Sequence, residues 1–257
     1  MTVAPKTGSG NIYADLAGYY DLFCAEVDYA EQCAFARRVF NTFSCSGGMD
    51  YLDLACGSGQ HLLAMQNYGF AAQGLDNSSE MLALAAQRCP AAQLHLCDLA
   101  AFEQQGSFDL ITCFLYSIHY SHPLAALEQT LQRSFAALKP GGILLFNTVD
   151  ARGIQNDAGI STSLKHDDAQ LGFRSAWHYR GEGEVLDLKL EISRSCNGQS
   201  EQWQDAHVMT ALTFSQLQAM LAEAGFVVQM LEHDYSVLQQ WNGASFNALV
   251  VATKPLA

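Results

Sequence analysis

The chain has 257 residues, of which 49% are hydrophobic and 15% charged, and this composition is typical of a globular domain with a good-sized core. Its 13 basic and 26 acidic residues give a formal net charge of −13, which repels polyphosphate, and no run of lysine or arginine offsets it locally. We therefore expect no nucleic-acid partner, and a small or cationic substrate fits better.

Cysteine usage and the absence of long apolar runs indicate a compartment. The eight cysteines form no CxxC or CxxxC pair, and several fall in expected core elements, as is typical of reduced, buried thiols. Residues 1–10 lack the apolar stretch of a secretion signal, and no run approaches the roughly 20 apolar residues that cross a bilayer. We expect a cytoplasmic protein with no membrane partner.

The first 44 residues are expected to form a cap segment and a helix. Residues 1–10 are rich in Gly, Ser and Thr and are predicted to fray. Residues 11–23 then gather three tyrosines and a phenylalanine ahead of a helix predicted from about Asp28 to Phe43. Such an aromatic segment is expected to cover another part of the molecule, and for Tyr19 a role in capping the core is preferred.

The next stretch, Tyr51 to Gly59, is the one around which the chain is organised. Its apolar residues predict a strand buried on both faces, and this strand ends on Asp53 and a glycine-containing turn before a helix over 61–67. A strand, a glycine turn and a helix N-terminus make a nucleotide-type cradle. The third glycine of a dinucleotide fingerprint is missing, because Leu62 stands there, so a pyrophosphate ligand is disfavoured.

Two further strands are predicted to end on carboxylates. The strand over 71–76 ends on Asp76, and the strand over 93–98 ends on Asp98, so that three strand ends carry an aspartate at intervals of about 22 residues. Ser78 is a plausible N-cap for the helix after the second strand. Because parallel strand ends point into one crevice, these carboxylates are expected to meet there.

The remaining core elements follow in order. Residues 107–115 predict a fourth strand, residues 116–120 a loop at its carboxyl end, residues 123–138 a helix and residues 143–149 a fifth strand. Between the core segments, residues 151–212 predict an antiparallel three-stranded meander with strands near 172–180, 185–193 and 200–210. After this insertion, residues 213–226 predict a helix and turn, and 227–232 with 245–253 a closing antiparallel pair.

Together these stretches resemble the class I S-adenosylmethionine (SAM) methyltransferases. Asp53-x-Ala-Cys-Gly-x-Gly59 is similar to the first motif of that family, Gly74-Leu-Asp-x-Ser-x-x-Met-Leu82 to the second, and Phe108-Asp-Leu-Ile111 to the next. The resemblance implies an α/β fold, with a Rossmann-like seven-stranded, mostly parallel sheet, helices on both faces and a small antiparallel β lid. It divides the chain into residues 1–44, a SAM-binding core at 45–150, a lid at 151–212 and the rest of the core at 213–257.

The resemblance also implies the cofactor site. SAM is the expected cofactor and S-adenosyl-L-homocysteine (SAH) the product. Asp76 would hold the ribose, Asn77 and Met81 would border the adenine, and Asp98 would accept the adenine amino group. The full set of expected cofactor contacts is Tyr20, Asp53, Ala55, Cys56, Gly57, Gly59, Asp76, Asn77, Met81, Asp98, Leu99 and Phe114.

The acceptor is expected between the segment from Tyr13 to Tyr20, the loop from Tyr116 to Tyr120 and the lid. His119 is the residue expected to touch it, as a base, an orienting donor or only a packed ring, and Tyr13 is expected to act as a gate. The lid side chains expected near the acceptor are Arg174, Trp177, His178, Tyr179 and His207, although strand alternation turns Trp177 and Tyr179 to one face and His178 to the other.

Function is expected to be methyl transfer from SAM to a nitrogen or oxygen of a small molecule. A lid after the fifth strand resembles that of glycine-type and deoxyamino-sugar N-methyltransferases, but their Glu-x-His-x-x-Arg pattern is met only in part, by Asp205, His207 and Thr210. No metal-ligand cluster is visible, so no metal is expected. A non-catalytic SAM-binding protein and a nicotinamide oxidoreductase are the alternatives, and the chain is expected to be a monomer or a homodimer.

Overall fold

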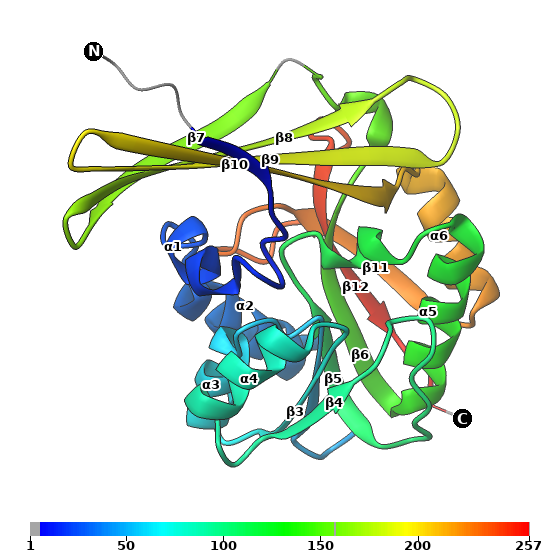
Figure 1. Cartoon of the computed structure of the whole chain (residues 1–257). Coiled ribbons are helices and arrows are strands. Elements are labelled where there is room, and N and C mark those ends of the chain that lie inside the picture. The colour runs from blue at the N-terminus through cyan, green and yellow to red at the C-terminus, as the bar shows by residue number, and fades with distance from the viewer. Residues whose placement is uncertain (1–5, 157, 257) are drawn as a thin grey trace.

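The computed structural model describes residues 6–156 and 158–256, which form two β-sheets and a set of helices around the larger one (Figure 1). The larger sheet has seven strands in the order β11-β12-β6-β5-β2-β3-β4. Its strands are β2 (Asp50–Leu54), β3 (Ala71–Asp76), β4 (Gln93–Leu96), β5 (Phe108–Cys113), β6 (Leu138–Val149), β11 (Val227–Glu232) and β12 (Asn247–Thr253). Five neighbouring strands are parallel and β12 is antiparallel to both its neighbours, which confirms the expected class.

Helices cover both faces of this core sheet. They are α2 (Tyr29–Phe43), α3 (Gln60–Asn67), α4 (Ser79–Arg88), α5 (Leu124–Ala137) and α6 (Phe214–Glu223). Apolar residues of α2 and α3 pack on one face, against Tyr51 and Leu110, while those of α5 and α6 pack on the other, against Leu52 and Ile111. Since adjacent residues of β2 and β5 face opposite sides, both strands are buried on both faces, as their apolar runs predict.

Capping side chains fix where several helices begin. Ser78 accepts a hydrogen bond from the amide of Met81 and caps α4, as predicted, and Asp28 caps α2 in the same way. Thr213 and Gln216 form a capping box at the start of α6.

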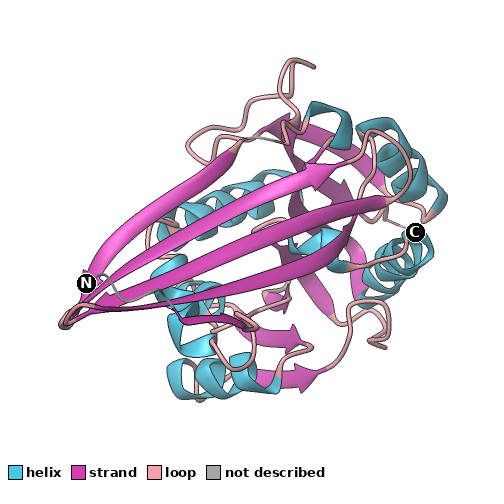
Figure 2. Ribbon diagram, turned by 45° about the horizontal axis from the view of Figure 1, so that its top comes forward, coloured by secondary structure: helices cyan, strands magenta, loops and turns pink. Residues whose placement is uncertain are grey.

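The smaller sheet is the lid, with strands in the order β1-β10-β9-β8-β7. They are β1 (Lys6–Ser9), β7 (Gly159–His166), β8 (Ala169–Tyr179), β9 (Val185–Cys196) and β10 (Gln199–Thr210). The long strands run side by side across the core (Figure 2). The expected three-stranded meander was wrong in number, because β7 adds a fourth antiparallel strand and β1 pairs in parallel with β10.

The expectation that residues 1–10 fray was wrong for residues 6–9, and residues 1–5 lie outside the described part of the chain. Glycine and serine weaken a strand, but the free edge of β10 supplies the hydrogen-bond partners that β1 needs.

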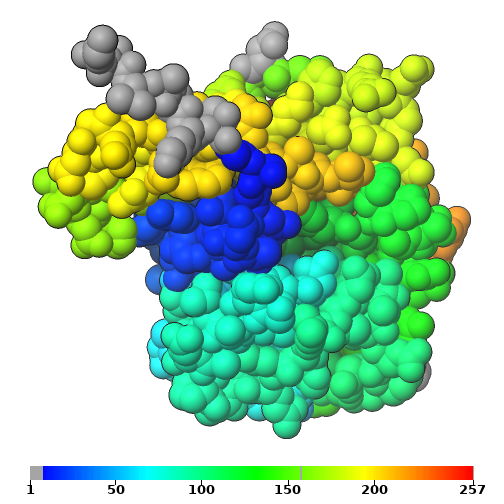
Figure 3. All heavy atoms as spheres, in the orientation of Figure 1, coloured from blue at the N-terminus to red at the C-terminus, as the bar shows by residue number. Residues whose placement is uncertain are grey.

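The N-terminal segment, residues 10–24, lies between the lid and the core (Figure 3). It contains the short helices η1 (Ala17–Tyr19) and α1 (Tyr20–Phe23). Its buried Ile12 and Leu16 pack against apolar residues of β8 and β9, and Tyr19 packs against Trp203 of β10. Polar contacts also join the segment to the core: Ser78 donates to the carbonyl of Tyr13, and Asp21 pairs with Arg88 and accepts from Ser58. The predicted aromatic cover therefore joins lid and core.

Two other features bear on the expectations. Within the described residues, no helix is both long and apolar enough to cross a membrane. All eight cysteines are free thiols, of which Cys24, Cys33, Cys56, Cys89 and Cys113 are buried, while Cys45 is exposed.

Candidate functional site

The turn after β2 builds one end of the site from backbone. Ala55, Gly57 and Gly59 adopt φ angles of 59°, 54° and 84°, in the left-handed region. At Gly57 a Cβ atom would point toward Met81 and Tyr20, 3.5 and 3.7 Å away, so a side chain would fill the space that they border. Here glycine keeps the turn open.

Asp76 links this turn to the end of β3. Its Oδ2 accepts from the amide of Gly57 at 2.8 Å and its Oδ1 from the amide of Ser78 at 2.9 Å. Burial raises its pKa, although the backbone hydrogen bonds oppose the shift. Because each carboxylate oxygen has a second lone pair, Asp76 retains acceptor capacity for two hydroxyl groups.

Asp53 is buried at the end of β2 with one oxygen free. Its Oδ1 accepts from Thr112 at 3.1 Å, while Oδ2 is buried with no hydrogen-bond partner among the described residues. Burial raises the pKa of Asp53 to about 7. A buried, unpaired carboxylate oxygen is costly unless a ligand supplies a donor, so this atom points to a cationic or hydrogen-donating ligand group.

These groups fit SAM, the cofactor that the resemblance implies. One cavity beside the turn is lined by Tyr20, Tyr29, Asp53, Ala55, Cys56, Ser58, Gln60, His61, Phe114, Leu115 and Ser117. The free oxygen of Asp53 can accept from an ammonium group, and Asp76 can accept from ribose hydroxyls. The structure thus assembles in one place the expected contacts at Tyr20, Asp53, Ala55, Cys56 and Phe114.

The other expected cofactor contacts lie at the same carboxyl edge of the sheet. Met81 is fully buried beneath the turn, Leu99 is buried, and Asn77 and Asp98 are exposed. The amide of Cys97 donates to the carbonyl of Asp76, which places the Asp98 loop beside the end of β3. Asp98 accepts from the amide of Ala100 at 2.8 Å. Their assignment as cofactor contacts remains a prediction.

The loop after β5 is strained and held in place. Leu115 and Tyr116 have φ angles of 55° and 60°, which cost about 1 kcal/mol or more each in residues other than glycine. Asn147 of β6 accepts a hydrogen bond from the amide of Tyr116 at 3.0 Å. The loop thereby directs the Tyr116 ring against Trp177 of β8 and His233, with ring centroids 4.8 and 5.7 Å away.

His119 lies in the predicted loop after β5, where it takes the packed-ring role, one of the three considered for it. It is buried, with Nδ1 donating to the carbonyl of Thr210 at 2.7 Å and Nε2 accepting from the amide of Val149 at 3.3 Å. Nε2 also lies 3.0 Å from the hydroxyl of Thr148. Burial lowers the pKa of His119 to about 4. Because both ring nitrogens are bonded to the protein, His119 joins the loop to β10 in this structure and offers no nitrogen to an acceptor, contrary to expectation.

A second polar cluster forms where the N-terminal segment, the loop and the lid meet. The hydroxyls of Tyr13 and Tyr120 lie 2.9 Å apart, and the ring of His207 lies 5.2 Å from that of Tyr13 and 5.6 Å from that of Tyr120. Asp205 holds His207 through its Nε2 at 3.0 Å and accepts from the amide of Ile12 at 2.8 Å. We call Tyr13, Tyr120, Asp205 and His207 the junction cluster. Burial raises the pKa of both tyrosines, so their hydroxyls stay protonated near neutral pH.

The other lid residues are divided between its two faces. Trp177 and Tyr179 share the inner face, as alternation predicts, but the Tyr179 hydroxyl binds the carbonyl of Gly183 near the turn. Arg174 and His178 were expected near the acceptor, yet they lie on the outer face, opposite Glu191 and Asp187 of β9. Leu171 and Phe173 are buried on the inner face, so strand alternation turns Arg174 and His178 to the outer face.

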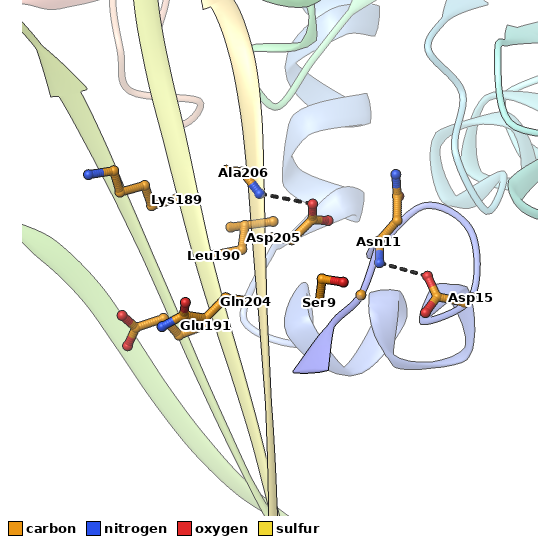
Figure 4. A pocket seen from close by; sticks show the side chains of 10 residues that line it. Ser9, Asn11, Asp15, Lys189, Leu190, Glu191, Gln204, Asp205 and Ala206 are labelled. Atoms are coloured by element: carbon orange, nitrogen blue, oxygen red, sulfur yellow. Dashed lines mark hydrogen bonds between the residues drawn. The ribbon is translucent and has the colours of Figure 1, made fainter. Parts of the chain in front are cut away.

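An open groove lies between the N-terminal segment and strands β9 and β10 of the lid (Figure 4). Asn11 and Asp15 line it from the N-terminal segment and Lys189 and Glu191 from β9, and Asp205 of the junction cluster also lines it. The lining carries three carboxylates and one ammonium group, so the local charge is negative. These carboxylates favour a positively charged group of a ligand over a negatively charged group at this place.

Several residues of the site were not singled out from the sequence. Tyr29, Gln32 and His61 gather beside Asp53, and His233 and Tyr235 line the far side of Tyr116. A signal existed for Gln32, a polar residue at a buried position of an amphipathic helix. No comparable local signal existed for His233 and Tyr235, which stand in a loop.

Comparison with known proteins gives results in agreement with this geometry. A family model described as a methyltransferase domain matches residues 52–142. A protein of Geobacillus sp. (strain WCH70) that is named as a methyltransferase is 27% identical over 87% of this chain and 92% of its own length. The dTDP-3-amino-3,4,6-trideoxy-alpha-D-glucopyranose N,N-dimethyltransferase of Streptomyces venezuelae is 25% identical, covering 85% of this chain and 92% of that protein.

Among solved structures, the sugar N-methyltransferase KedS8 from Streptoalloteichus sp. ATCC 53650 superposes with a TM-score of 0.80 at 21% identity. The match covers 99% of both chains, so it includes the lid as well as the core. At this level of identity the match shows a shared fold.

Proposed function

We propose that this chain, which is a class I SAM-dependent methyltransferase, methylates the nitrogen of a small amine bound at the junction cluster. The observation that carries the proposal is the junction cluster itself, with neutral tyrosine hydroxyls and a histidine held by a carboxylate that lines an acidic groove. An amino sugar is the acceptor class that agrees with the relatives named above.

When bound, SAM supplies a methyl group on a positively charged sulfur, and the rest of the task is alignment. The protein has to hold the acceptor nitrogen in line with that methyl group and keep water out. The turn after β2 and Asp76 would fix the cofactor, while Tyr20 of the N-terminal segment closes over the turn. Phe114 and Leu115 line the cofactor cavity from the loop after β5.

The tyrosines suit the orientation of an amine. Their protonated hydroxyls can each donate or accept one hydrogen bond, and their rings attract the positive charge that develops on the nitrogen as it gains the methyl group. Tyr13 packs on Tyr20, which lines the cofactor cavity, with ring centroids 5.7 Å apart, and it adjoins Ile12, which donates to the groove residue Asp205. This position agrees with the gate that the sequence predicts for Tyr13.

His207 is suited to take the proton of the amine. Its Nε2 is engaged by Asp205, and no other hydrogen bond to its ring is seen within the described residues, which leaves Nδ1 for a ligand. The Asp205 carboxylate that accepts from Nε2 fixes the orientation of the ring and leaves the lone pair on Nδ1. The role that the sequence suggested for His119 is therefore reassigned to His207.

The proposal is tested by incubating the protein with SAM and paired acceptors that differ only in one group. A dTDP-linked 3-amino-deoxysugar and the corresponding 3-hydroxy sugar form such a pair. With the amino sugar, we expect the amine to gain a methyl group and SAH to be released. Mass spectrometry detects both products. Methylation of the hydroxy sugar at an equal or higher rate would contradict N-methylation.

A further inference from the structure

His61 lies beside Asp53 in the cofactor cavity, at the start of α3. It is buried, and its ring packs between those of Tyr29 and Phe114, with centroids 4.9 and 5.1 Å away. This packing fixes the plane of the ring. Neither the family resemblance nor the mechanism proposed above assigns a role to His61.

A hydrogen bond to Gln32 decides which ring nitrogen carries the proton. His61 Nε2 lies 2.7 Å from the Oε1 atom of Gln32, which can only accept, so Nε2 is the protonated nitrogen. Nδ1 then carries a lone pair. Burial lowers the pKa of His61 to about 3, so the ring is neutral.

The lone pair of Nδ1 faces the free oxygen of Asp53. The distance from Nδ1 to Oδ2 of Asp53 is 3.9 Å, too long for a hydrogen bond, and Oδ2 has no other partner among the described residues. Two acceptors thus face each other across a gap without a donor. Since a donor atom at about 2.9 Å from each can bridge 3.9 Å, one ammonium nitrogen fits between them.

We propose that His61, with its tautomer set by Gln32, binds the α-ammonium group of SAM together with Asp53. The inference rests on the proposed function for the presence of SAM and adds a ligand for one of its groups. An ammonium group has three donor protons, so it can satisfy Oδ2 of Asp53, Nδ1 of His61 and one further acceptor at once. A doubly protonated His61 would repel the ammonium group. The contact with Gln32 places the single proton of the neutral ring on Nε2 and so leaves Nδ1 as an acceptor.

Two substitutions separate the two ring nitrogens. In His61→Gln the side-chain amide takes the place of Nε2, which keeps the contact with Gln32 and removes the acceptor at Nδ1. In His61→Asn the carbonyl oxygen takes the place of Nδ1, which keeps that acceptor and removes the Gln32 contact. The pair therefore distinguishes ligand binding from ring packing.

The experiment measures by calorimetry how tightly wild type and both variants bind three ligands. SAH carries the ammonium and the carboxylate, decarboxylated SAH keeps only the ammonium, and 5′-methylthioadenosine has neither. We expect His61→Gln to weaken SAH and decarboxylated SAH about ten- to hundredfold and to leave 5′-methylthioadenosine within about twofold. His61→Asn should bind SAH and decarboxylated SAH more tightly than His61→Gln.

Other results would overturn the inference in distinct ways. If His61→Gln weakens the binding of all three ligands equally, His61 only packs against its neighbours. If His61→Gln binds SAH as tightly as the wild type does, His61 does not contact the cofactor. Loss of SAH alone, with decarboxylated SAH unaffected, would assign the contact to the carboxylate. Wild-type protein that binds none of the three would overturn the proposed function as well.

If His61→Gln does not fold, ring-nitrogen NMR of the wild type decides the question. The proposal predicts that SAH shifts the Nδ1 resonance of His61 while 5′-methylthioadenosine does not. An Nδ1 resonance that responds to neither ligand, or equally to both, would overturn it.

Discussion

The two halves of the site are built in different ways. The cofactor half comes from strand ends and their turns between Asp53 and Asp98, and its central contacts use backbone amides and carboxylates. The acceptor half comes from segments far apart in the chain, since the hydroxyls of Tyr13 and Tyr120 meet across 107 residues. It uses aromatic and imidazole side chains.

Because of this difference, residues of the acceptor half can be substituted without altering the cofactor half. The sheet fixes the cofactor half, because moving Asp76 would break its hydrogen bonds to Gly57 and Ser78. The junction cluster depends on how lid and N-terminal segment pack over the core, so its side chains can vary while the cofactor half stays intact. We therefore expect substitutions in the two halves to have separable effects on cofactor affinity and on turnover.

The largest expected effect is on turnover, in His207→Ala. Loss of a proton acceptor is expected to lower kcat by roughly 10²- to 10⁴-fold, while SAH affinity changes little. Steady-state kinetics with an amine acceptor and calorimetry with SAH measure the two effects. His178→Ala is the matched control, because His178 lies on the outer face of the same sheet. If kcat falls equally in His207→Ala and His178→Ala, His207 has no specific role in methyl transfer.

The acceptor half was also the part that sequence reasoning located least well. Asp53 and Asp76 could be located from the sequence because they lie at strand ends, and parallel strands place their ends together. Asp98 was predicted to end its strand, but β4 ends at Leu96, so Asp98 lies in the loop that follows. His119 could not be assigned correctly, since its burial depends on the carbonyl of Thr210, 91 residues away. The outward direction of Arg174 follows from the register with β9, which no local pattern determines.

The fold itself followed from the sequence except at two edges of the lid. The apolar runs and aspartate-ended strands predicted the core closely, since both faces of its strands are buried. β7 was missed because its alternating pattern is weak: only Ile160 and Leu164 are large and apolar, and Ile160 is exposed in the structure. β1 was missed because its pairing depends on β10, nearly 200 residues later.

The second prediction concerns stability at low pH and sharpens the structural role of His119. Its pKa is lowered to about 4 in the folded protein, against about 6.5 when unfolded, so below pH 6.5 the unfolded chain binds a proton that the folded protein does not. The wild type therefore loses stability as the pH falls from 6.5 to 4, by about 3 kcal/mol for this group.

His119→Asn removes that titration and retains an amide donor near Thr210. Denaturant unfolding at pH 7.5, 6, 5 and 4 should show the difference in stability between wild type and variant shrink as the pH falls. The comparison cancels the contributions of His61 and Asp53, which both proteins share. A difference that stays constant with pH would show that His119 is not kept neutral in the folded protein.

The third prediction ranks two carboxylates of the cofactor half. Asp76→Ala should weaken SAH binding by about 1.5–3 kcal/mol, because a buried carboxylate loses charge-assisted hydrogen bonds to the ribose. Asp98→Ala should cost less than about 1 kcal/mol, since Asp98 is exposed to water. Calorimetry with SAH gives both values. A larger loss of SAH affinity in Asp98→Ala than in Asp76→Ala would contradict the assignment of the ribose to Asp76.

The smallest expected effect is that of Asn147→Ala at the strained loop. Losing one hydrogen bond to the amide of Tyr116 should lower stability by about 1 kcal/mol. Because Tyr116 belongs to the acceptor half, KM for the acceptor should rise while SAH affinity is retained. Thermal unfolding and kinetics measure these changes, and a loss of SAH affinity without a change in KM would place the loop in the cofactor half.

The most direct test of the two-part site is a crystal structure of the protein with SAH and a dTDP-linked amino sugar. We predict that the ribose of SAH contacts Asp76. We also predict that the amino group of the sugar lies beside Tyr13, Tyr120 and His207, in line with the sulfur. An amino sugar bound on the outer face of the lid, beside Arg174 and His178, or an SAH ribose away from Asp76, would contradict these predictions.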